Sequence, residues 1–97
     1  MLDKDKKALV EMSWGMHGEV EAAYLAHVAK QGDSDWSDKQ SLLLADMALH
    51  LLQTALAEQG LCSEKLRHNL NAILTISDHF LPQAELRAAA DKLYQEP

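Results

Sequence analysis

Two acid–histidine pairs are the residues whose types and spacing best suit metal chemistry. His17 and Glu21 stand four residues apart, as do Asp46 and His50. Residues at this spacing share one side of a helix, and pairs on two facing helices can converge on a metal ion in a bundle core. The chain lacks the Glu-x-x-His repeats of carboxylate-bridged metal proteins. No cofactor is therefore predicted, and a metal-binding helical bundle with these four ligands is kept as an alternative function.

A further candidate for chemistry is His68, which the helical pattern turns toward solvent. The surrounding segment LRHNLNAILTI, residues 66–76, forms an apolar helical frame. This segment resembles the H-box of some sensor histidine kinases. The resemblance implies that His68 accepts a phosphoryl group and that Asn69 and Asn71 support it. Because no nucleotide-binding segment follows, only a bare phosphotransfer module would fit. This is the first alternative function, and metal binding is the second.

Other catalytic motifs are absent from the sequence, so no enzyme activity is predicted. There is no glycine-rich phosphate loop, nucleophile elbow or paired-cysteine motif. Cys62 is the only cysteine, which excludes a disulfide within the chain and fits a reducing compartment. A reactive thiol needs a cationic environment, and Cys62 is expected to be a passive loop residue.

Charge and hydropathy narrow the classes of partner. The net charge of −6 argues against nucleic-acid binding, which depends on neutralising phosphates with Lys and Arg. No apolar run is long enough to cross a bilayer, and the first residues lack the apolar core of a signal peptide. We therefore expect a cytoplasmic protein that binds neither nucleic acid nor membranes.

The elements that must position these residues are all helical. Apolar periodicity predicts one domain over residues 1–97, a small antiparallel bundle with helices at about 3–31, 37–59, 63–80 and 82–95. Ser37 and Gln40 match a capping box, and Gly60 suits the left-handed position after a helix. The helix between them is apolar over most of its girth, which makes it the centre of the bundle. Its thin polar strip is expected to lie at a solvated or interface edge, and it comprises Lys39, Asp46, His50 and Gln53.

The first helix carries two rows with different side-chain bulk. One is an apolar stripe of Leu9, Met12, Met16, Val20 and Ala23, and the other is a small-residue row of Gly15, Gly18, Ala22, Ala26 and Ala29. A face without bulk lets another helix approach closely, so the small row is expected to pack on the central helix. A break near Trp14–Gly18 is the alternative, because glycine also interrupts helices.

The leading prediction is a small acidic protein-interaction module, such as an adaptor, an inhibitor or a regulatory subunit. Four short helices are unlikely to cover both long helices fully, and an uncovered apolar remainder marks an interaction surface. The partner would be another protein or a second copy, with a homodimer expected. The predicted interface residues are Trp14, Gly15, Gly18, Ala22, Tyr24, Ala26 and Trp36.

Overall fold

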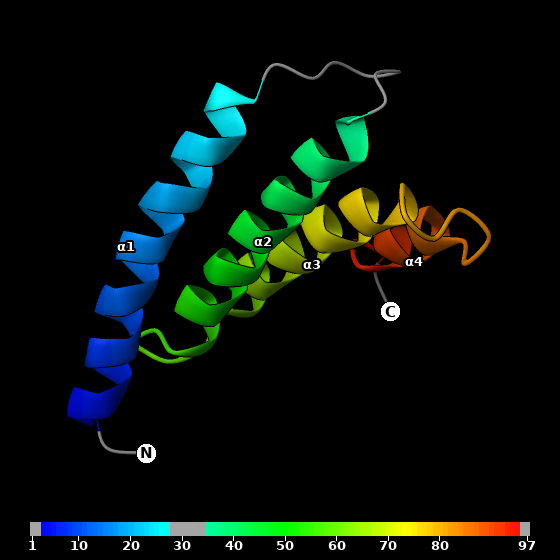
Figure 1. Ribbon diagram of the computed structural model, residues 1–97. Coiled ribbons are helices and arrows are strands. Elements are labelled where there is room, and N and C mark those ends of the chain that lie inside the picture. The colour runs from blue at the N-terminus through cyan, green and yellow to red at the C-terminus, as the bar shows by residue number, and fades with distance from the viewer. Residues whose placement is uncertain (1–2, 28–34, 96–97) are drawn as a thin grey trace.

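The computed structural model describes residues 3–27 and 35–95, and these form an all-α fold. The helices are α1 (Asp3–Ala26), α2 (Trp36–Ala55), α3 (Ser63–Asp78) and α4 (Leu86–Lys92). Consecutive helices run in opposite directions (Figure 1). The predicted bundle of three long helices and a short C-terminal helix is therefore confirmed. None of the described helices has the length and apolar character needed to cross a membrane.

The helices pack in chain order, which leaves the fold open and flat. In the described part of the chain α1 contacts only α2, α2 also contacts α3, and α3 also contacts α4. The molecule measures 45 × 39 × 16 Å, with a radius of gyration of 15.2 Å. A compact chain of this length would have a radius of gyration of about 12.5 Å. The expected central position of α2 is confirmed, but α2 is covered on two sides only.

Several predicted helix ends are wrong. The first helix ends at Ala26, whereas the prediction continued to residue 31, and residues 28–34, which include Ala29 of the small row, lie outside the described residues. The second helix begins at Trp36 with Asp35 as its N-cap, so Ser37 lies inside the helix. The Ser37 hydroxyl lies 3.0 Å from His79 Nε2 instead of forming the predicted capping box. Gly60 does have a left-handed φ of 93°, but α2 itself ends earlier, at Ala55.

The last helix is shorter than predicted. It begins at Leu86 instead of Pro82, and residues 82–85 form turns. Glu85, immediately before the helix, has a φ of 55°, a conformation that a non-glycine residue rarely adopts. Ala90 is 3% exposed, and α4 packs against α3.

The orientation of α1 is the main correction to the sequence analysis. The helix is continuous through Gly15 and Gly18, so the alternative of a break near Trp14–Gly18 is wrong. A Cβ atom added at either glycine would meet nothing within 4 Å, which shows that the small row faces away from α2. The bulky stripe is not buried either, since Met12 is 64% and Met16 51% exposed. A third face of α1 must therefore contact α2.

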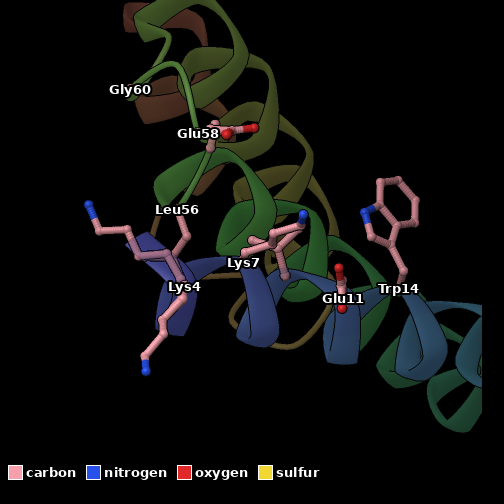
Figure 2. Close-up of a pocket in the computed structure, with 10 residues that line it drawn as sticks. Lys4, Lys7, Glu11, Trp14, Leu56, Glu58 and Gly60 are labelled. Carbon is pink, nitrogen blue, oxygen red and sulfur yellow. The ribbon is translucent and has the colours of Figure 1, made fainter. Parts of the chain in front are cut away.

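A hollow of about 430 Å³ lies where the start of α1 meets the end of α2. It is lined by Lys4, Lys6, Lys7, Val10, Glu11, Trp14, Leu56, Ala57, Glu58 and Gly60. The ammonium groups of Lys4 and Lys7 point in different directions and do not converge on one point (Figure 2). The hollow therefore shows no arrangement of charges suited to holding an anion.

Candidate metal centre

The contact between α1 and α2 is a polar seam. Ser13 on α1 is 1% exposed, and its hydroxyl donates a hydrogen bond of 2.6 Å to the Val10 carbonyl. Gln53 Nε2 on α2 donates to the same hydroxyl across the seam at 3.2 Å. Farther along, the Lys39 ammonium lies 4.9 Å from the centre of the Tyr24 ring. The polar strip of α2 therefore faces α1, and the solvated edge expected for it is wrong.

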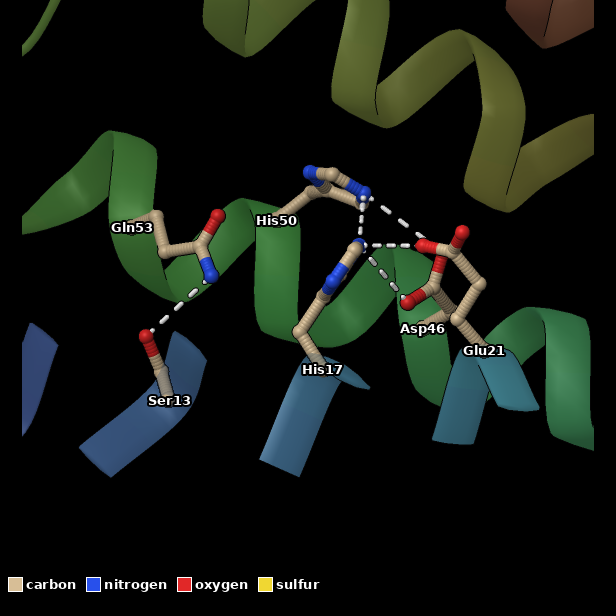
Figure 3. Close-up of polar contacts among 6 residues, drawn as sticks. All are labelled: Ser13, His17, Glu21, Asp46, His50 and Gln53. Carbon is tan, nitrogen blue, oxygen red and sulfur yellow. Dashed lines mark hydrogen bonds and ion pairs between the residues drawn. The ribbon is translucent and has the colours of Figure 1, made fainter. Parts of the chain in front are cut away.

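Two histidines and an aspartate converge at the middle of this seam (Figure 3). His17 Nε2 on α1 lies 3.0 Å from His50 Nε2 on α2. It also lies 3.1 Å from Asp46 Oδ1, while His50 Nε2 lies 3.5 Å from Asp46 Oδ2. One potential ligand atom from each of the three residues lies within 4.8 Å of the others. The cluster thus brings three potential metal ligands from two helices to one point.

The carboxylate of Asp46 lacks a full set of partners. Asp46 is 8% exposed, and its Oδ1 atom is buried without a hydrogen-bond partner, although His17 Nε2 is close. A buried carboxylate is costly unless it is paired or coordinates a metal. Only one of the two facing Nε2 atoms can donate to the other, because a neutral imidazole has a single N–H. A cation between the three residues would satisfy the carboxylate and both nitrogen lone pairs.

The distances can be compared with those around a small tetrahedral ion. Zinc bonds of about 2.0–2.2 Å to nitrogen and oxygen place neighbouring ligand atoms of a tetrahedron about 3.3–3.6 Å apart. The two Nε2 atoms, 3.0 Å apart, and His17 Nε2 and Asp46 Oδ1, 3.1 Å apart, are closer than that range, while His50 Nε2 lies 3.5 Å from the other carboxylate oxygen, Oδ2. The three side chains would therefore have to shift to share one ion. Glu21 Oε2 lies 3.5 Å from His17 Nε2, and its side chain is 51% exposed. Glu21 is therefore free to rotate into the fourth position, which water would otherwise occupy.

The helical hairpin explains why these residues meet. The helices α1 and α2 run in opposite directions. The pair His17 and Glu21 on α1 therefore lies beside the pair Asp46 and His50 on α2. The structure thus brings together three of the four ligand candidates identified from sequence spacing, and the fourth, Glu21, lies beside His17. The Trp14 ring, 5.5 Å from the His17 ring, packs edge-on against it and helps to orient it. The small buried Ser13 lets the helix backbones approach one turn away.

His68 lies apart from this centre on α3. Its side chain is 61% exposed, its Nδ1 lies 2.9 Å from the Tyr94 hydroxyl, and its Nε2 lies 3.9 Å from Glu64. His68 and Asn69 border a groove of about 440 Å³ between α1 and α3, whose floor includes His50 and Gln53. Exposure keeps His68 accessible to a phosphoryl donor, and the phosphoacceptor role stays a prediction.

The predicted interface residues are spread over different parts of the surface. Gly15, Gly18, Ala22 and Ala26 are exposed on the outer side of α1, and Trp14 is 54% exposed at the groove. Tyr24 and Trp36 are half-buried. These residues do not form one continuous patch, and their role in an interface stays a prediction.

Comparison with known proteins does not assign the chain to a family. Neither a protein family, nor a curated protein, nor a solved structure matches the chain. The function must therefore be argued from the residues themselves.

Proposed function

We propose that this protein binds a divalent transition-metal ion, with zinc as the best fit, through His17, Asp46 and His50. The observation that carries the proposal is the convergence of one ligand atom from each residue within 4.8 Å across two helices. The buried Asp46 Oδ1 supports it, because this oxygen makes no hydrogen bond although His17 Nε2 lies 3.1 Å away, and a cation would pair with both atoms. Glu21 completes the coordination when its exposed side chain rotates inward.

The donor set favours zinc over the common alkaline-earth ions. Zinc takes imidazole nitrogen and carboxylate oxygen in four-coordinate sites. Calcium requires about six to eight oxygen ligands and magnesium an octahedral oxygen shell, and two imidazoles suit neither ion. Two histidines and one carboxylate also form the facial triad of non-haem iron sites. The nearby Glu21 favours zinc, because a fourth protein ligand fills one of the positions that an iron triad leaves open.

The ion would join α1 to the rest of the molecule. In the described structure α1 contacts only α2, and the seam between them is polar. Polar contacts contribute less net stability than buried apolar surface. Metal binding to the folded state adds its binding free energy to folding. We therefore assign the protein to metal-stabilised helical modules. The exposed free thiol of Cys62 is compatible with a reducing cytoplasm.

Thermal unfolding with and without zinc tests this proposal. Free zinc at about 100 times its dissociation constant stabilises a folded protein by about 2.7 kcal/mol. For a chain of this size that corresponds to a rise in Tm of about 10–20 °C. Titration calorimetry on chelator-treated protein should give one zinc ion per chain. His17→Ala, Asp46→Asn and His50→Ala should each weaken binding by more than the roughly 10- to 100-fold caused by losing an outer-shell partner.

The chain supplies a matched control on α3. Glu64 and His68 form an acid–histidine pair with the same spacing as His17 and Glu21, but without a histidine from a second helix. His68→Ala should therefore leave the zinc affinity and the zinc-dependent Tm unchanged. Zinc binding that is lost in His68→Ala but kept in His50→Ala would overturn the assignment, as would a wild-type protein that binds no zinc.

A further inference from the structure

One face of the α1–α2 hairpin is apolar and uncovered. With about 100° of rotation per residue, the flank of α1 opposite Trp14 carries Leu9, Met12 and Met16, which are 37%, 64% and 51% exposed. The adjoining flank of α2, away from α3, carries the exposed Ala45 and the half-buried Leu52. We call these five residues the back face. It lies on the side of the hairpin opposite the groove that His50 and His68 border.

The back face contains no charged side chain, although the protein as a whole is acidic. Between Lys39 and Glu58 the only charged residue of α2 is Asp46, which is buried in the seam. On α1, Glu19 lies at the outer edge of the flank, and the exposed Asp5 lies at its N-terminal end, one turn before Leu9. The net charge of −6 would repel a second copy at most other surfaces. The apolar back face is therefore the part of the surface best suited to contact the same face of a second copy.

The single chain exposes far more surface than a compact protein of its mass. Its accessible area is 7007 Å² for 10.8 kDa, whereas a compact monomer of that mass exposes about 5,500 Å². The excess of about 1,500 Å² exceeds the roughly 800 Å² that each partner buries in a standard interface and falls in the range of obligate homodimers. Among the described residues the buried apolar side chains are only Leu49 and Ala90. The excess accessible area of the single chain is therefore similar to the area that one subunit buries in a dimer interface.

From these observations we infer that a second copy of this chain packs on the back face. Two antiparallel α1–α2 hairpins related by a twofold axis would form a four-helix core, with Met12 and Met16 of each copy against the other copy. A single layer of helices would then become the two layers that stable domains require. A second copy is the partner that supplies an identical apolar face in equal amount. The metal site lies in the seam, so the pairing does not depend on zinc.

Light scattering and methionine oxidation of the wild-type protein test this inference together. The mass at micromolar concentration should be twice 10.8 kDa, in chelator and in zinc alike. Met12 and Met16 should resist peroxide in the native protein and become oxidised once it is denatured. A monomer, or a dimer in which both methionines oxidise as fast as in the denatured chain, would overturn the proposal. A dimer that forms in a protein unable to bind zinc would still support it.

Charge substitutions on the two flanks of α1 provide a matched pair. Met16→Glu places a carboxylate on the back face and should shift the protein to a monomer or unfold it. Leu25→Glu changes a residue that is 70% exposed on the opposite flank, and it should leave the mass and the helical circular dichroism unchanged. Dissociation by Leu25→Glu alone, with Met16→Glu still a dimer, would place the interface elsewhere.

Discussion

At the scale of single residues, the candidate site rests on the mutual position of His17, Asp46 and His50. An acid–histidine pair at the same spacing is not unusual in this chain, since Glu64 and His68 form one on the exposed side of α3. What distinguishes the three is convergence, with 3.0 Å between the two imidazole nitrogens and a buried carboxylate oxygen left without a hydrogen bond. Buried polar atoms in native proteins are nearly always satisfied, and among the described side chains Asp46 Oδ1 and Asn69 Oδ1 are buried without a hydrogen bond.

Asp46→Asn should separate two effects of the Asp46 carboxylate: the stability that its burial costs the metal-free protein and the stability that it adds as a zinc ligand. Without metal at mildly alkaline pH, the substitution replaces a buried carboxylate with a neutral amide, and the free energy of unfolding should stay the same or rise by up to about 1 kcal/mol. With zinc present the variant should be less stable than the wild type by about 2 kcal/mol or more, because the ligand is lost. Urea unfolding in chelator and in zinc measures both values. A large loss of stability in chelator would mean that Asp46 stabilises the fold without metal.

At the scale of helices, apolar periodicity predicted which segments are helical better than which faces meet. The small row of α1 was expected to pack on α2, yet α1 contacts α2 through a face that includes Ser13 and His17. A periodic pattern shows which residues share a face but does not show which partner covers that face. The acid–histidine spacing gave His17, Glu21, Asp46 and His50 only as candidates for an alternative function, and their role as ligands stays a proposal. Their convergence depends on the rotation of α1 about its axis, which the sequence does not reveal.

A pair of substitutions on α1 tests that rotation. Gly18→Ala adds a methyl group where nothing lies within 4 Å, so it should stabilise the helix by about 0.5–1 kcal/mol. Ser13→Leu adds bulk at a position that is 1% exposed, so it should destabilise the fold by about 1–3 kcal/mol and weaken zinc binding by forcing the seam apart. Chemical unfolding and zinc titration of both variants provide the comparison. The opposite order of stabilities would mean that the small row is the packed face.

At the scale of the whole molecule, polar and apolar surfaces of α1 and α2 lie on different sides of the hairpin. The polar faces of α1 and α2 meet each other in the seam, and we propose that a second copy covers the apolar back face. This arrangement explains why a chain with 47% hydrophobic residues buries so few of them by itself. The predicted all-α architecture and central α2 are correct. The open, flat shape was not predictable from composition, because composition does not show whether apolar surface is covered within one chain or between two.

X-ray absorption spectroscopy of the zinc-loaded protein tests the central claim most directly, because it reports the ligand atoms themselves. The account predicts a four-coordinate zinc with two imidazole nitrogens and oxygen in the remaining positions, at about 2.0–2.2 Å. Asp46→Asn and His50→Ala should each remove that spectrum, whereas His68→Ala should leave it intact. A six-coordinate shell of oxygen alone, or sulfur at about 2.3 Å from Cys62, would contradict the assignment of the ion to the α1–α2 seam.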